Sequence, residues 1–170
     1  HNPEFTSMEA YCAYSDINGM MRLTEGLFGA IADELGLGDT LNYQGQQINI
    51  AAPFRAAPMS ELVSEVVGRE VSMESPVESL RELCDAHELP YDVSWGVGRL
   101  IFTLYDELVE KTLVNPTFVC DYPVEVSPLA KRKPDDLRLT ERFELVVAGH
   151  EYANAFTELN DPVDQEQRFQ

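Results

Sequence analysis

The sequence predicts an α+β fold in which antiparallel strands carry a helical insertion, and three observations support this prediction. Aromatic and alternating stretches typical of strands lie towards both ends of the 170-residue chain. Apolar residues recur at helical spacing through its middle. The chain is long enough to bury the core of one domain. We therefore expect a sheet-forming core from residues 1–58 and 115–170, with a helical insertion over 59–114.

The first third of the chain is expected to contain a strand, a helix and a hairpin. Residues 5–14 predict the strand, because aromatic and apolar side chains alternate along them. Asp16 is placed to cap a helix that ends near Gly36, and glycine is favoured at helix C-termini. Short strands over 41–43 and 47–50 then predict the hairpin. The apolar stripe of the helix consists of Met20, Leu23, Leu27, Phe28, Ile31 and Leu35.

Three helices are predicted in the insertion. The first runs from about Met59 to Gly68. The second begins at Ser75-Pro76-Val77-Glu78, which combines an N-cap, a proline at the first helical position and the glutamate of a capping box. The third covers roughly 97–112. Because the second and third helices are amphipathic, we expect them to pack on one another, independently of the sheet.

Strands are expected to return in the last third of the chain. Thr117–Cys120 predicts one, and Pro123 and Pro128 bracket the loop that follows it. This loop carries much of the scarce positive charge in Lys131, Arg132 and Lys133, which is typical of a solvated turn. The stretch RFELVVAGHEYANAF predicts a β-hairpin that turns near Gly149.

The formal net charge of −18 is the most informative bulk property. A surface this acidic repels phosphate backbones, so we expect no direct nucleic-acid binding by this stretch of chain. The charge serves either solubility or a pocket for a cationic substrate. The 3 cysteines lie far apart, which suits the reducing cytoplasm, and no Cys/His spacing is typical of a zinc site. No apolar run approaches the roughly 18 residues of a membrane helix, so no membrane partner is expected.

Acidic side chains recur on the predicted strands, at Glu9, Glu144, Glu151 and Glu158. A strand carboxylate usually faces solvent, and this is the simplest interpretation. Together with Tyr11 and Asn154, the carboxylates could instead line a polar cleft that binds Mg²⁺ through oxygen ligands and holds an ammonium group. Strict alternation places Asn154, Phe156 and Glu158 on one face and Glu151 on the other. Glu151 would therefore join them only through a β-bulge or from the turn.

Three segments carry a resemblance to a known family. HNPEFTSMEAYCAY resembles the second half of motif 2 in the class II lysyl-tRNA synthetases. PTFVCDYPVEVSPLAKR and RFELVVAGHEYANAFTELNDPVDQEQRF resemble the stretch that leads towards motif 3 of the same family. The resemblance covers most of the chain. It implies that the strands form the antiparallel sheet portion of a class II catalytic domain.

The resemblance also implies an activity and a set of site residues. In the family, lysine and ATP form lysyl-adenylate with Mg²⁺, and the lysyl group passes to its tRNA. The intact enzyme is then expected to be a cytoplasmic homodimer. Carried over by position, the ATP-binding residues are His1, Asn2 and Phe5, the lysine-binding residues are Glu9, Tyr11, Asn154, Phe156 and Glu158, and the metal ligands are Glu144 and Glu151.

Departures from the family pattern lead us to interpret the chain as a fragment that is inactive alone. The motif 2 arginine is expected before His1, motif 3 with its arginine beyond Gln170, and the anticodon-binding barrel elsewhere. Leu137 also stands where relatives usually carry proline.

Three other interpretations stay open. Aspartyl and asparaginyl synthetases share the His-x-Pro-Glu-Phe opening, but Glu9 and Glu158 suit an ammonium substrate better. A paralogue that lysylates a translation factor shares HNPEFT. A non-catalytic module could use residues 59–114 as a partner surface.

Overall fold

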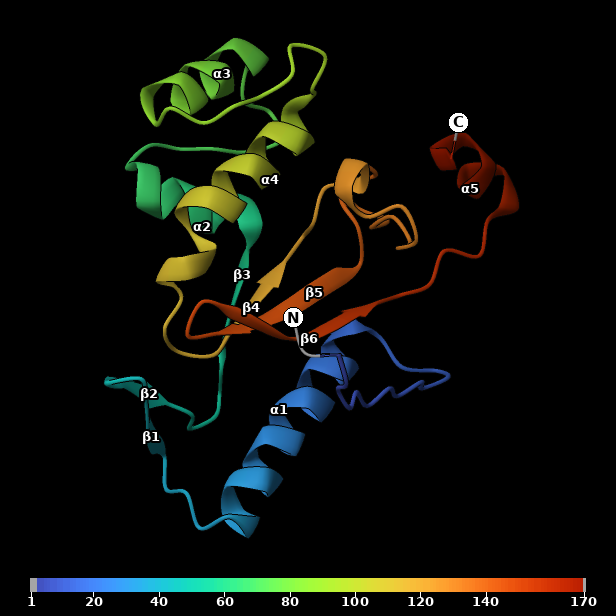
Figure 1. Ribbon diagram of the computed structural model, residues 1–170. Coiled ribbons are helices and arrows are strands. Elements are labelled where there is room, and N and C mark those ends of the chain that lie inside the picture. Colours follow the sequence, from blue (N-terminus) through green and yellow to red (C-terminus); the bar gives the residue numbers. More distant parts are fainter. Residues whose placement is uncertain (1–2, 170) are drawn as a thin grey trace.

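The computed structural model describes residues 3–169, and it confirms the predicted α+β class (Figure 1). A four-stranded sheet has the order β3-β4-β5-β6, and β1 and β2 form a separate hairpin. The elements are α1 (Ile17–Glu34), β1 (Thr40–Tyr43), β2 (Gln46–Asn49), β3 (Arg55–Pro58), α2 (Met59–Val67), α3 (Val77–Ala86), α4 (Val97–Leu108), the 3₁₀ turn η1 (Glu110–Thr112), β4 (Thr117–Cys120), the 3₁₀ turn η2 (Val124–Val126), β5 (Arg142–Val147), β6 (His150–Phe156) and α5 (Pro162–Phe169).

The four-stranded sheet is mixed rather than wholly antiparallel. β4, β5 and β6 pair antiparallel, as expected. β3 was not predicted, and it pairs parallel to β4 with Arg55 opposite Thr117. A parallel neighbour requires a crossover connection, and here α2, α3 and α4 provide it. The insertion therefore links two adjacent strands of the sheet.

Helices cover both faces of the sheet, and the alternation of strand side chains explains how. Val119 and Val146 belong to a core shared with α2, α3 and α4. Their chain neighbours Phe118 and Leu145 face the other way, into a core shared with α1 and the β1–β2 hairpin. Figure 1 shows these two layers on opposite sides of the sheet.

The insertion helices do pack on one another, with Leu80 of α3 and Leu104 of α4 in one buried cluster. That cluster also contains Tyr122 and Val146 from the sheet side of the molecule. The expectation that the helices pack independently of the sheet is therefore wrong, because their apolar faces are buried against the strands as well. The division of the chain at residues 59–114 stays a prediction.

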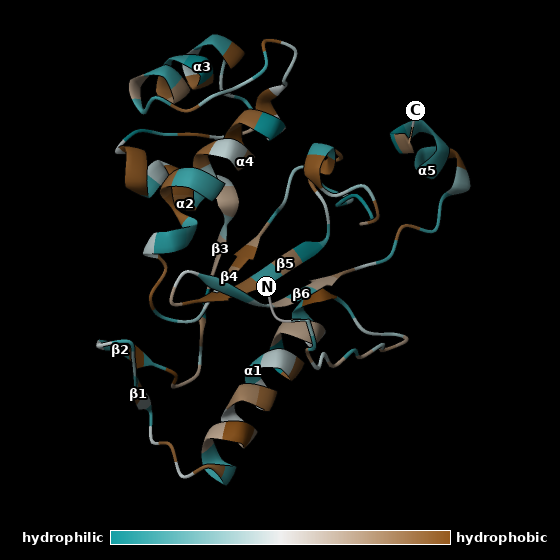
Figure 2. Cartoon of the chain, in the orientation of Figure 1, coloured by the Kyte–Doolittle hydropathy of each residue, from teal (hydrophilic) through white to brown (hydrophobic). Residues whose placement is uncertain are grey.

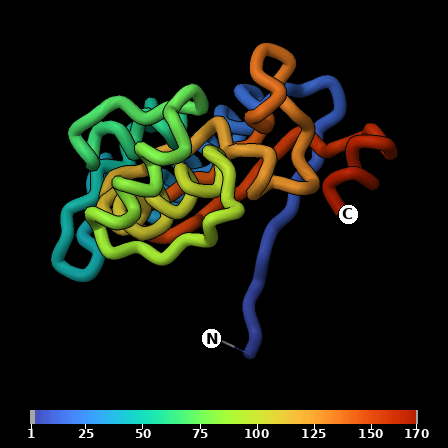
Figure 3. Tube along the Cα trace, turned by 90° about the horizontal axis from the view of Figure 1, so that it is seen from above, coloured from blue at the N-terminus to red at the C-terminus, as the bar shows by residue number. Residues whose placement is uncertain are grey.

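The segment before α1 is not the predicted strand over 5–14. It is extended but unpaired, and its side chains are exposed, with Phe5 at 84% and Tyr11 at 80%. A strand needs a neighbour for its backbone N–H and C=O groups, and none pairs with this segment within residues 3–169. Figure 3 shows the segment extending away from the rest of the molecule.

The helix boundaries follow the sequence signals with one exception. Asp16 caps α1 by accepting a hydrogen bond from the Gly19 N–H at 2.7 Å. The capping box predicted for α3 is absent, because the Ser75 hydroxyl oxygen instead accepts from the Ser72 N–H at 2.9 Å. Hydrophobic and hydrophilic residues interleave along α1 and the insertion helices (Figure 2). No helix within residues 3–169 is long and apolar enough to cross a membrane.

Candidate active site

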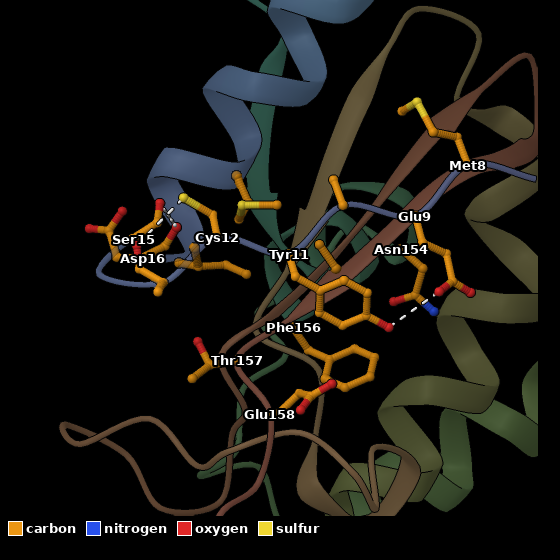
Figure 4. Close-up of a pocket in the computed structure, with 15 residues that line it drawn as sticks. Met8, Glu9, Tyr11, Cys12, Ser15, Asp16, Asn154, Phe156, Thr157 and Glu158 are labelled. Carbon is orange, nitrogen blue, oxygen red and sulfur yellow. Dashed lines mark hydrogen bonds between the residues drawn. The ribbon is translucent and has the colours of Figure 1, made fainter.

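A cavity of about 560 Å³ lies between β6 and the extended segment before α1. The five residues predicted to bind lysine all line it, although they come from opposite ends of the chain. Figure 4 shows Tyr11 close to Glu9 and Asn154, with Phe156 at the end of β6 and Glu158 just beyond it. The five residues are Glu9, Tyr11, Asn154, Phe156 and Glu158.

Negative charge dominates this cavity. The Tyr11 hydroxyl donates a hydrogen bond to Glu9 Oε2 at 3.2 Å. The charge of Glu9 and this hydrogen bond raise the pKa of Tyr11, and the charge of Glu158 adds to the rise. Tyr11 is therefore a neutral hydrogen-bond donor at physiological pH, flanked by two carboxylates. Such a cavity favours a ligand that carries ammonium groups.

A β-bulge brings Glu151 to the same face of the sheet as Asn154. Leu145 pairs with Ala153, but Val146 pairs with Glu151, so Tyr152 is an extra residue in β6. Asn154 lies opposite Glu144. Residues directly opposite on antiparallel strands share a face, as do residues two apart on one strand. Glu144, Glu151 and Asn154 therefore lie on one face, which is the geometric condition that the sequence required.

Glu144 is held by two donors and is largely buried, with its side chain 11% exposed. Its Oε1 accepts from Arg142 Nη2 at 2.5 Å, and its Oε2 accepts from the Tyr122 hydroxyl at 2.7 Å. Burial, followed by the charge of Glu144, raises the pKa of Tyr122, so this phenol stays protonated and donates. The orientation of the Glu144 carboxylate is consequently fixed before any ligand binds.

The two glutamates predicted as metal ligands, Glu144 and Glu151, have the oxygen donors that suit a magnesium ion. Burial and the charge of nearby Glu144 raise the pKa of Glu151, which places the two carboxylates in the same electrostatic environment. Within residues 3–169, no group of three or more His, Cys, Asp or Glu side chains could hold a metal ion. Mg²⁺ is commonly bound through one or two carboxylates together with substrate phosphates and water, so two carboxylates suffice.

Phe5, one of the predicted ATP-binding residues, does not line this cavity. The Phe5 ring is exposed on the extended segment, and His1 and Asn2 lie outside the described residues. Sequence reasoning missed Arg142 and Tyr122, both of which contact Glu144. A period-two pattern could have indicated Arg142, which is two residues before Glu144 on β5 and so shares its face. Nothing in the local sequence places Tyr122 beside Glu144, because the loop that follows β4 brings it there.

Comparison with known proteins is consistent with this fold. The family described as tRNA synthetases class II (D, K and N) matches residues 1–170. The chain belongs to this family, whose members share a class II catalytic domain.

Within this family, the similar curated relatives are lysine–tRNA ligases. The chain is 48% identical to a lysine–tRNA ligase of Leuconostoc mesenteroides over 170 residues. It is 45% identical to a lysine–tRNA ligase of Lactiplantibacillus plantarum over 170 residues, and 47% identical to one of Streptococcus pyogenes over 171 residues. Each match covers 100% of this chain but 34% of the relative, so the chain spans about a third of their length.

Proposed function

We propose that the chain supplies part of the active site of a lysine–tRNA ligase that acts in cytoplasmic protein synthesis. The observation that carries this proposal is the single cavity lined by Glu9, Tyr11 and Glu158. Two carboxylates beside a neutral phenol suit a substrate with two amino groups. The similarity to lysine–tRNA ligases supports the same substrate.

The proposed first step joins lysine to ATP. An oxygen of the lysine carboxylate attacks the α-phosphorus, the bond from that phosphorus to the bridging oxygen breaks, and pyrophosphate leaves. The chain contributes mainly by positioning, which brings the reacting atoms together before the barrier is crossed. The lysyl group then passes from the adenylate to the terminal ribose of tRNA, which we propose as the macromolecular partner of the whole protein, a homodimer.

Each side chain of the cavity has a distinct part in this proposal. Glu9 and Glu158 hold the two amino groups of lysine through charge-assisted hydrogen bonds, and Tyr11 orients Glu9. Phe156 packs along the aliphatic part of the substrate. Asn154 lies next to these residues on β6 and contributes an amide.

The nucleotide side of the proposal rests on fewer described residues. Phe5 stacks on the adenine, with His1 and Asn2 nearby. Glu144 and Glu151 would hold Mg²⁺ with the phosphates of ATP, where the ion would neutralise phosphate charge.

The charge of the cavity also favours lysine over aspartate and asparagine, the substrates of the other members of the family. Aspartate would bring a side-chain carboxylate, in addition to the α-carboxylate that every amino acid carries, into a cavity that already contains Glu9 and Glu158, and asparagine lacks the side-chain ammonium group. Like charges in one site repel each other. The cavity therefore favours lysine over both.

The test is amino-acid-dependent exchange of pyrophosphate into ATP by the full-length protein. We expect exchange with lysine and none with aspartate or asparagine at equal concentration. Aspartate-dependent exchange would transfer the proposal to the aspartyl branch of the family. No exchange with any of the three amino acids would refute the proposed activity and leave the interaction-module alternative.

A further inference from the structure

The Arg142 guanidinium lies between the candidate lysine pocket and the candidate metal site. Its Nε–H donates to Asn154 Oδ1 at 3.2 Å, and its Nη2 donates to Glu144 Oε1 at 2.5 Å. The Arg142 and Glu144 side chains are 16% and 11% exposed, so the bond between them is largely shielded from water, whereas the bond to Asn154 lies at the exposed side of the cavity. One side chain thus contacts a lining residue of the cavity and a predicted metal ligand.

Further contacts hold Arg142 in this position. Its Nη1 donates to the Ser127 hydroxyl at 2.9 Å and to the Val126 carbonyl at 3.1 Å. Its Cζ lies 4.4 Å from the centroid of the Tyr122 ring, which is a cation–π contact. The Tyr122 hydroxyl also donates to Glu144, so Arg142, Tyr122 and Glu144 form a closed set of contacts. A planar guanidinium with donors on three sides suits this arrangement, and a lysine ammonium does not.

The chemistry of arginine determines which way Asn154 points. A guanidinium has five N–H donors and no acceptor, so Asn154 must turn its oxygen towards Arg142. The Asn154 NH₂ group is then directed away from Arg142. Asn154 therefore offers hydrogen-bond donors to the cavity, where an acceptor such as a substrate carboxylate would receive them. The same guanidinium fixes the Glu144 carboxylate by a charge-assisted bond.

We infer that Arg142 is a positioning residue that orients Asn154 towards the substrate and Glu144 towards the metal at the same time. This inference rests on the proposed function. Because one rigid group supports both sites, loosening it should weaken lysine binding and metal binding together. Mutation of a residue that orients a ligand-binding side chain typically costs 10- to 100-fold in affinity or activity.

The main experiment compares Arg142→Lys with wild type in the full-length protein. We expect the lysine Kd from calorimetry and the lysine KM from pyrophosphate exchange to rise by roughly 10- to 100-fold. Binding of Mn²⁺ in the presence of ATP, followed by electron paramagnetic resonance, should weaken as well. Arg138→Lys is the matched control, since Arg138 pairs with Asp136 and Glu74 away from the cavity. It should leave both affinities within about twofold. If both affinities of Arg142→Lys equal those of wild type, the inference is overturned.

A second variant tests the orientation of Glu144 separately from the orientation of Asn154. Tyr122→Phe removes a donor to Glu144 but no bond to Asn154. It should therefore weaken Mn²⁺ binding and change lysine affinity much less. An equal loss of both affinities would indicate general loosening of the site and would contradict the assigned geometry.

A double-mutant cycle distinguishes orientation of Asn154 from a merely structural role. If Arg142 acts on lysine through Asn154, then Arg142→Lys should change lysine affinity little, within about twofold, once Asn154 is alanine. A full additional loss in that background would overturn the inference.

Should Arg142→Lys fail to fold, the lysine Kd of Ser127→Ala provides the test instead. This variant removes one hydrogen bond to Arg142 and touches neither Glu144 nor Asn154. A raised lysine Kd supports the inference, and an unchanged one refutes it.

The outcomes also distinguish this inference from the proposed function. A wild-type protein that does not bind lysine refutes the proposed function and the inference together. A wild-type protein that binds and activates lysine, combined with an unaffected Arg142→Lys, refutes the inference alone.

Discussion

Individual glutamates of the site differ in how their charge is balanced. Glu144 is paired with Arg142 in the largely buried part of the site. Within residues 3–169, neither Glu9 nor Glu158 forms an ion pair with Lys or Arg, and both line the cavity. The chain has 30 acidic and 12 basic side chains, so many carboxylates necessarily lack a protein partner. Glu9 and Glu158 are distinguished from the others because they lie together across one cavity.

Replacement of Glu158 by glutamine tests this assignment at the level of one residue. Glu158→Gln keeps the shape and removes the charge, and a hydrogen bond between charged partners contributes roughly 1.5–3 kcal/mol. In the full-length protein, the lysine KM should therefore rise by roughly 10- to 150-fold. The KM for ATP should change little, because the phosphates are assigned to Glu144 and Glu151. Steady-state adenylation at varied lysine and varied ATP measures both.

Glu9→Gln should behave in the same way, and Glu82→Gln is the control on the exposed side of α3. A shift in ATP dependence without a shift in lysine dependence would reverse the assigned roles. If neither parameter moves, Glu9 and Glu158 are ordinary exposed carboxylates.

Among the secondary-structure elements, α4 is the one whose position depends most on close contact. A Cβ atom built at Gly98 would lie 2.6 Å from Pro123 Cβ and 3.0 Å from Glu125 Oε1. Glu125 also accepts a hydrogen bond from the Arg99 N–H at 2.9 Å, at the start of α4. Gly98 therefore allows α4 to lie directly against η2, the turn that precedes Ser127.

Two glycine-to-alanine variants test this packing against intrinsic helix propensity. Gly98→Ala should lower the free energy of unfolding by about 1–3 kcal/mol, because the added methyl group overlaps the η2 side chains. Gly26→Ala in α1 meets nothing within 4 Å, so it should raise that free energy by up to about 1 kcal/mol. Urea denaturation followed by circular dichroism measures both. Changes of the same sign and size would show that α4 does not depend on this contact.

Elements with a strong local pattern were predictable, and elements defined by distant partners were not. α1, the β1–β2 hairpin and the β5–β6 hairpin follow from periodicity and turn residues. β3 has the sequence RAAP, which carries no alternation, and it becomes a strand because β4 pairs with it. Residues 5–14 carry the alternation without a partner and stay unpaired. In both segments, the presence or absence of a pairing strand determines whether a strand forms, and the local sequence does not specify that partner.

In the candidate site too, some features were predictable from the sequence and others depend on contacts between distant segments. The five lysine-pocket residues came from the family resemblance, and the fold brings all five to one cavity. Whether Glu151 could join them depended on a bulge that alternation alone cannot locate. The contacts of Arg142 with Ser127, Tyr122 and Asn154 cross between separate elements, so only the fold reveals them.

Considered as a whole, the molecule presents its candidate site at the edge of the sheet. β6 is the last strand in the order, and the cavity lies between it and the exposed segment before α1. The net charge of −18 adds a long-range attraction for cations to this edge. That attraction is screened by salt, whereas bonds within an enclosed pocket are screened much less.

This open geometry predicts weak lysine binding by residues 1–170 alone. Tyr11 is 80% exposed in this chain, so water competes for every polar group around it. An exposed ion pair contributes about 0–1 kcal/mol, against roughly 1.5–3 kcal/mol for a charge-assisted bond in an enclosed pocket. With two carboxylates affected, the isolated chain should bind lysine at least about 100-fold more weakly than the full-length protein. It should also catalyse no lysine-dependent pyrophosphate exchange. Calorimetry at low and high salt measures the affinity, with circular dichroism to establish that the isolated chain is folded. Equal lysine affinities for the folded chain and the full-length protein would mean that the cavity is already complete within residues 1–170.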